Sequence, residues 1–187
     1  MKKIVAGLLI PVLSGCLTAS VPKETCWLLE YQGTPKAERK GDFGIGRVSQ
    51  VVVRTPYNDD EIVVLRANGS IAADPYNRFA AQPSTFLKGV ISDAMHASGR
   101  FTSVVNAASS AYSDSSVEVM VTRLALDCRQ ADSRHAVAVV ILRVLQGGKI
   151  VAIAKGEGQA DAADGVYGAA FSRAFSQAID TAFGQLK

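Results

Sequence analysis

One run in the second half of the chain, Ala136 to Leu145, is apolar at both odd and even positions. A β-strand with one face in water alternates apolar and polar residues, so a run without alternation is typical of a strand covered on both faces. We therefore expect a central strand over Arg134–Gln146, covered at least in part on both faces. Such a strand requires neighbouring strands and a second layer that buries it.

Further strand-like runs surround this segment in the sequence. Gly147-Gly148 predicts a tight hairpin after it. Asn68-Gly69 predicts a type I′ hairpin turn, which needs positive φ at both central residues. Asp74–Pro83 is polar and aromatic, and is expected to be a connector. The predicted strands are Cys26–Tyr31, Ile45–Arg54, Glu61–Arg66, Ser70–Ala73, Phe101–Val105, Val117–Cys128 and Lys149–Gly158.

Two amphipathic helices complete the pattern. The first is expected to start near Ser84 as its N-cap and to stop at Gly99. The second is expected to start near Asp164, and its apolar side chains recur at helical spacing on one face from Phe171 to Leu186. Strands and two amphipathic helices predict one α+β domain over residues 26–187, with two layers and a mostly antiparallel sheet.

The N-terminus has the three parts of an export signal: Lys2 and Lys3, an apolar stretch from Ile4 to Val12, and small residues before Cys16. Leu-Ser-Gly-Cys resembles the lipobox of bacterial lipoproteins. We therefore expect a signal peptide over residues 1–15, a lipid anchor on Cys16 and a tether over residues 16–25. A transmembrane helix would need about 20 apolar residues, and the stretch from Ile4 to Val12 is too short for one. Leu17 in place of Asp favours the outer membrane, with the domain in the periplasm.

The net charge and the cysteine content limit the classes of partner and the covalent links that we expect. Removal of residues 1–15 takes away Lys2 and Lys3 and lowers the formal net charge from +3 to +1. No basic run is interleaved with aromatics, so nucleic acid is not an expected partner. Cys26 and Cys128 then remain, and an even count in an oxidising compartment favours a disulfide between them. The alternative is two separate buried thiols. With no histidine partner nearby, the two cysteines do not form a zinc set.

Catalytic patterns are absent from the sequence: it has neither a Gly-x-Ser-x-Gly elbow nor a phosphate loop. His96 and His135 sit in no recognisable catalytic spacing, and the acidic cluster around Asp60 is typical of a solvated turn. We expect a protein that is not an enzyme and holds no cofactor or metal. The arginines Arg54, Arg66 and Arg78 can bind carboxylates or lipid head groups, or they can pair within the fold.

The middle of the chain resembles a known family. The segments Val51–Tyr57, Ile62–Arg66 and Tyr76–Pro83, the last ahead of an amphipathic helix, are similar to the ABC-type transport auxiliary lipoproteins of the paraquat-inducible (Pqi) kind. In that family Arg-Trp-Ala is common where this chain has Arg78-Phe79-Ala80. The substitution keeps an aromatic ring and loses the indole N–H.

The resemblance implies a membrane-anchored accessory subunit of an intermembrane lipid transport system, which docks onto MCE-domain or ABC transporter subunits and makes or breaks no bond. A homo-oligomeric ring of this subunit is one form of the same hypothesis. We expect the docking face to include Pro75–Pro83, with Tyr57, Arg66, Tyr76, Arg78 and Phe79 as partner-binding residues. Two other classes stay open: an envelope-structural or outer-membrane assembly lipoprotein that partners a β-barrel, and a periplasmic hydrolase that uses His96, His135 or Asp60.

Overall fold

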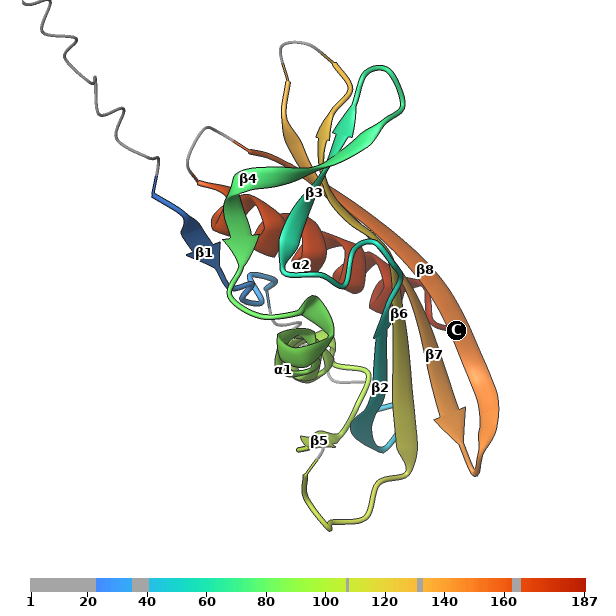
Figure 1. Ribbon diagram of the computed structural model, residues 1–187. Helices are drawn as coiled ribbons and strands as arrows, with labels where there is room; N and C mark the ends of the chain where they lie inside the picture. Colours follow the sequence, from blue (N-terminus) through green and yellow to red (C-terminus); the bar gives the residue numbers. More distant parts are fainter. Residues whose placement is uncertain (1–22, 35–40, 107, 131–132, 163–165) are drawn as a thin grey trace, which may run out of the picture.

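The computed structural model describes residues 23–34, 41–106, 108–130, 133–162 and 166–187. Among these residues, eight strands form one mixed sheet, and two helices accompany it (Figure 1). This confirms the predicted α+β class. In chain order the elements are β1 (Thr25–Trp27), β2 (Ile45–Val53), β3 (Glu61–Arg66), β4 (Ile71–Phe79), α1 (Pro83–Ser98), β5 (Ser103–Val105), β6 (Ser115–Cys128), β7 (His135–Gln146), β8 (Lys149–Asp161) and α2 (Tyr167–Gln185).

The long strand β6 organises the sheet. On one side it pairs antiparallel with β7, which in turn pairs antiparallel with β8. Its other side is shared by two shorter strands, because β2 runs parallel to its first half and β3 runs parallel to its last residues. β4 then pairs antiparallel with β3, and β1 pairs parallel with β4. β5 pairs parallel with β2, so the sheet ends in β1 and β5 on one side of β6 and in β8 on the other (Figure 1).

The second layer lies on one face of the sheet. Side chains of α1 and α2 share a single core with alternate residues of β7, from Ala136 to Val144, which are fully buried. The intervening residues point to the face without helices, where Val137 is buried and Val139 and Ile141 are partly exposed. The predicted central strand is confirmed, with one face fully covered and the other covered only in part.

Glycines let α2 approach β8 closely. A Cβ atom added to Gly156 would lie 1.8 Å from the carbonyl oxygen of Ala178, and one added to Gly158 would lie 2.0 Å from that of Ala174. Neither distance is possible, so only glycine fits at these two positions of the strand. The carbonyl oxygens on that side of α2 therefore lie directly against β8.

Two turn predictions have different outcomes. Gly147 and Gly148 both have positive φ, 56° and 76°, and they join β7 to β8 as the predicted tight hairpin. The hairpin at Asn68-Gly69 is also present, between β3 and β4. However, only Gly69 has positive φ there, so the turn is not type I′. The Asn68 carboxamide instead accepts hydrogen bonds from the backbone N–H and the hydroxyl of Ser70.

Two boundary predictions are wrong. Most of the expected connector Asp74–Pro83 continues β4 to Phe79, because this segment pairs with both β3 and β1. The helix α1 starts at Pro83, and Ser84 is not its cap. The Ser84 backbone N–H donates to the Asn58 side chain, so a residue from the turn before β3 satisfies this helix terminus. The proposed cap Asp164 lies outside the described residues.

The predicted disulfide is also wrong, because Cys26 and Cys128 are both free thiols. Cys26 lies opposite Arg78 on β4, whereas Cys128 lies opposite Arg66 near the far end of β3. Two strands separate β1 from β6, which places the thiols at least about 14 Å apart across the sheet. Bridged cysteines have Cα atoms within about 7 Å.

The predicted signal peptide, Cys16 and most of the tether lie outside the described residues. In the part of the chain that the structure describes, neither helix combines the length and the apolar character that crossing a membrane requires.

Candidate functional site

The N-terminal part of the domain lies along helix α2, and we call residues 24–32 the strap. After β1, the Glu30 N–H donates to the Ser172 hydroxyl (3.1 Å) and the Gln32 N–H donates to the Ser176 hydroxyl (2.8 Å). These serines are buried and four residues apart, so they lie on the same side of the helix. Side chains of α2 thus take the place of a neighbouring strand for this segment.

The end of the strap is fixed by Tyr31, which contacts Asp180 one turn further along α2. The Tyr31 hydroxyl donates to the Asp180 carboxylate at 2.6 Å. Burial of the ring, then the hydrogen bond to Asp180 and the charge of that carboxylate, raise the pKa of Tyr31 well above its usual value. The phenol therefore stays protonated and remains a donor across the physiological pH range.

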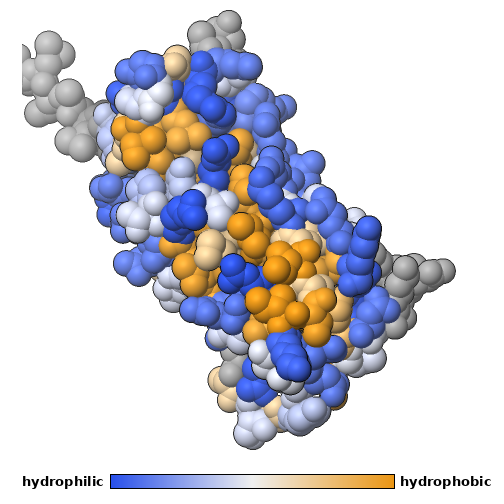
Figure 2. Space-filling model, turned by 90° about the vertical axis from the view of Figure 1, so that its right-hand side faces the viewer, coloured by the Kyte–Doolittle hydropathy of each residue, from blue (hydrophilic) through white to orange (hydrophobic). Residues whose placement is uncertain are grey.

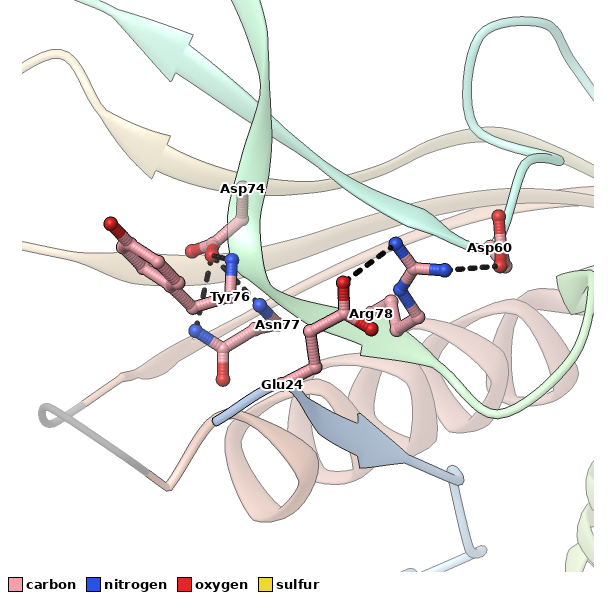
Figure 3. A network of polar contacts seen from close by, with 6 residues as sticks. All are labelled: Glu24, Asp60, Asp74, Tyr76, Asn77 and Arg78. Carbon is pink, nitrogen blue, oxygen red and sulfur yellow. Dashed lines mark hydrogen bonds and ion pairs between the residues drawn. The ribbon is translucent and has the colours of Figure 1, made fainter. Parts of the chain in front are cut away.

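The start of the strap is fixed to β4 by a polar network (Figure 3). The Arg78 guanidinium lies between Glu24 and Asp60, with N···O distances of 3.3 and 3.4 Å. One Asp74 oxygen accepts hydrogen bonds from the backbone N–H groups of Tyr76 and Asn77 and from the Asn77 carboxamide. The ion pairs are partly exposed, so each contributes little to stability. Their effect is to position the strap on β4.

The indole of Trp27 completes the contact between the strap and the body of the domain. Its N–H donates to the Asn77 side chain at 3.1 Å. Its ring lies against Gly168 near the start of α2, where a Cβ atom would come within 2.6 Å of it. Sequence reasoning missed this set of contacts. The available signal was the presence of Ser172, Ser176 and Asp180 at four-residue spacing beside the apolar face of the helix.

The predicted partner-binding residues have different environments. Tyr76 is exposed, as expected, and Arg66 is exposed at the end of β3. Tyr57 is half-buried. Phe79 is only 1% exposed and packs edge-on against Phe171, with ring centroids 5.3 Å apart. The prediction that Phe79 contacts a partner is therefore wrong for this fold.

Arg78 has an internal role in the structure, since both of its ion-pair partners belong to this chain. Its side chain is still 37% exposed, so it remains able to contact solvent or a partner at its edge. Of the residues predicted around Pro75–Pro83, it is Tyr76 that offers an exposed aromatic ring.

A second surface is formed by β2, β6, β7 and β8 on the side that carries no helix, and we call it the helix-free face. Its exposed apolar side chains are Val52 of β2 and Val151 and Ile153 of β8, which are 39%, 46% and 60% exposed. Met120 and Ile141 lie between them and are partly exposed. Seen from the side on which β7 and β8 lie, the molecule shows a band of apolar atoms crossed by polar side chains (Figure 2).

Two pairs of charged side chains lie on this face. Arg143 lies 3.9 Å from Glu118, and Lys155 lies 2.6 Å from Glu157. Lys155 lowers the pKa of the Glu157 carboxyl through a hydrogen bond and its charge. Beyond these residues, Val63, Ala125 and Val137 form a small buried cluster, against which Tyr57 and Leu65 pack. The face thus combines apolar side chains with two ion pairs and one further cation, the exposed Arg123 opposite Val139.

One hollow on this face measures about 260 Å³ and is lined in part by Arg123, Val139 and Glu157. The hollow around Val52, Met120 and Ile141 measures about 30 Å³. Pockets that enclose small molecules are typically about 300–1,000 Å³. A larger hollow of about 330 Å³ lies at the opposite end of β7, and its lining is polar: Asp127, Arg129, Gln130, Ser133, His135 and Gln159. There Arg129, hydrogen-bonded to Asp127, lowers the pKa of that carboxyl.

The residues of the hydrolase hypothesis lie in separate parts of the fold. His96 is in the last turn of α1, and Asp60 contacts Arg78. His135 opens β7, and its Nδ1 lies 2.8 Å from Asp161. Among the described residues, no group of three or more His, Cys, Asp or Glu side chains is arranged to hold a metal ion.

Among the comparisons with known proteins, only the comparison of structures finds matches. No protein-family model and no curated protein sequence matches the chain. The structure is similar to that of protein XCC0632 from Xanthomonas campestris, described as DUF330, with a TM-score of 0.65, 17% identity, and coverage of 85% of this chain and 90% of that one. A second crystal structure, of an uncharacterized protein, gives a TM-score of 0.58 at 14% identity, with coverage of 82% and 95%. At these identities the likeness shows the fold alone.

Proposed function

We propose that the protein is a lipid-anchored accessory subunit of an ABC/MCE-type intermembrane lipid transport system, which acts by binding and docking. The support comes from the export-signal pattern that ends at Cys16 and from the family resemblance of the segments between Val51 and Pro83. The observation that carries the proposal is the helix-free face. Its exposed apolar side chains are of the kind that mark interaction sites on folded proteins.

The shape of the helix-free face favours a protein partner over a small ligand. Its hollows of about 30 and 260 Å³ are both smaller than the roughly 300–1,000 Å³ of pockets that enclose small molecules. A nearly flat surface with apolar residues between polar pairs instead has the composition of a protein–protein interface, whose apolar centre is surrounded by a polar rim. We therefore place the docking surface on the helix-free face, with Tyr57 at its margin, instead of on Pro75–Pro83.

In this proposal the anchor and the docking face have separate roles. Cys16 carries the lipid and holds the protein at the outer membrane, with the domain in the periplasm. The strap holds the start of the domain against α2 and β4. The helix-free face binds the transporter subunit, and the chain itself performs no chemical step.

The test is affinity purification of the full-length, lipidated protein from detergent-extracted membranes, with identification of co-purifying proteins by mass spectrometry. We expect an MCE-domain or ABC transporter subunit with the unaltered protein. The double variant Val52→Lys/Ile153→Lys should lose it, because two charges would then be buried in the interface. Both positions are exposed, so the fold should be kept.

Tyr112→Lys is the matched control, because this residue is 76% exposed and lies outside the helix-free face. The control should retain the partner. Recovery of a β-barrel protein in place of transporter subunits would favour the envelope-assembly class. Unchanged recovery with the double variant would remove the helix-free face as the docking surface.

A further inference from the structure

The position of the strap limits how far the domain can lie from the membrane. The described structure begins at Lys23, and the strap is fixed to β4 and α2 from Glu24 onward. A fully extended chain from Cys16 to Lys23 spans at most about 25 Å. With lipid on Cys16, the start of β1 therefore stays within about 25–30 Å of the bilayer surface.

The β1 edge of the sheet exposes one surface of β1 and β4. Trp27 and Phe79 face the interior, so the alternate residues on each strand face outward. Leu28 is 57% exposed, Tyr76 is 47% exposed, and Cys26 is exposed between them. We call these three residues and the polar groups between them the strap face.

The charges on the strap face are close to balanced. Arg78 is paired with Glu24 and Asp60, and Lys23 is exposed beside them. Asp74 accepts three hydrogen bonds at the margin (Figure 3). A surface without a marked excess of positive charge has little electrostatic attraction to anionic lipid. It suits a zwitterionic surface such as phosphatidylethanolamine.

We propose that the strap face lies against the lipid head groups of the membrane that holds Cys16, with Leu28 and Tyr76 as its contact residues. This rests on the lipid anchor in the proposed function and adds the orientation of the domain. Tyrosine is favoured at the head-group level because its ring is apolar and its hydroxyl is polar. Two weak contacts are sufficient to orient the domain, since the lipid anchor already supplies the affinity for the membrane. β8 lies across the molecule from β1 (Figure 1), so its side of the sheet remains open to a partner.

The native thiol of Cys26 provides a probe in the centre of the strap face. In a Cys128→Ser variant, with Cys16 occupied by lipid, a fluorophore can be attached to Cys26 alone. The lipidated full chain is reconstituted into phosphatidylethanolamine/phosphatidylglycerol vesicles and isolated by flotation. The control carries the fluorophore on the helix-free face, in a Cys26→Ser/Cys128→Ser/Ile153→Cys variant.

We expect acrylamide to quench the fluorophore on Cys26 severalfold less than the fluorophore at position 153. Lipids with nitroxide-labelled head groups should quench the fluorophore on Cys26 and leave the one at position 153 unchanged. The double substitution Leu28→Glu/Tyr76→Glu should make the Cys26 fluorophore as accessible as the control while flotation is unchanged. More phosphatidylglycerol should not increase the protection.

The outcomes separate this inference from the proposed function. Equal quenching at positions 26 and 153 in floating protein would overturn the orientation and leave the anchor and the docking face standing. Protection that rises with the protein-to-lipid ratio would assign the strap face to a second copy of the chain, and would also overturn it. Protein that fails to float would overturn the anchor itself and the orientation with it.

Discussion

The C-terminal unit, β6 to β8 with α2, and the N-terminal region, the strap with β1 and β4, are held together differently. In the C-terminal unit β6 and β7 stay paired from Ser115 to Asp127, and α2 buries a continuous apolar face on them. β1 pairs with β4 only over Thr25–Trp27, and the rest of the strap is held by the buried Leu29 and by hydrogen bonds to side chains of α2. The strap buries less apolar surface than the C-terminal unit, so we expect it to open locally before the domain unfolds.

The largest effect is expected where α2 meets β8. Gly158→Ala should destabilise the domain by about 3 kcal/mol, because the added methyl group meets the backbone of α2 rather than a movable side chain. Urea unfolding measures the change. Gly184→Ala in the same helix is the control, since nothing lies within 4 Å of its Cβ position, and it should stabilise by up to about 1 kcal/mol. Equal effects of the two substitutions would contradict the close approach.

The next largest effect concerns the serines that hold the strap. Ser172→Ala/Ser176→Ala leaves the N–H groups of Glu30 and Gln32 without their acceptors and should cost about 1 kcal/mol for each lost bond. Amide hydrogen exchange should speed up at residues 30 and 32 while the amides of β7 keep their protection. Thr181→Ala is the control, because its hydroxyl bonds only to its own helix. Faster exchange throughout β7 would show that the strap and the core open as one unit.

Tyr31 is expected to give a smaller effect that depends on pH. Because its folded-state pKa is raised above the unfolded value near 10, the stabilisation is fully present below pH 10 and is lost as pH rises further. Tyr31→Phe should cost about 1 kcal/mol at pH 7 and should lose less stability than the unaltered protein above pH 10. Chemical denaturation at pH 7, 9 and 10.5 tests this, and parallel losses in the two proteins would count against the Tyr31–Asp180 bond.

The smallest effect is expected at Arg78. Arg78→Gln should change the free energy of unfolding by less than about 1 kcal/mol, because both ion pairs are partly exposed. The difference should shrink further in 1 M salt, where such pairs are screened. A loss of several kcal/mol in thermal or urea unfolding would mean that the network has a structural role equal to that of the core.

The elements that could be predicted from the sequence are those specified by local periodicity. The central strand around Ala136–Leu145, the hairpin at Gly147-Gly148 and the apolar face of α2 each follow from spacing within one segment. What could not be predicted depends on pairing between distant segments. β4 extends to Phe79 because β1, about 50 residues earlier in the chain, pairs with it, and that same pairing turns Phe79 inward.

The candidate site was predictable only in part for the same reason. An exposed Tyr76 follows from composition, whereas the partners of Arg78 and the distance between Cys26 and Cys128 are set by strand order. The helix-free face could not be recognised beforehand, because the apolar run in β7 looks the same whether a second helix layer or a partner protein covers it.

The most direct test of the docking role is site-specific photo-crosslinking in intact cells. Benzoylphenylalanine is placed at position 153 on the helix-free face, or at position 93, an exposed position on α1. The proposal predicts adducts to an MCE-domain or ABC transporter subunit from position 153 and none from position 93. Adducts from position 93 alone, while the complex still co-purifies, would contradict it.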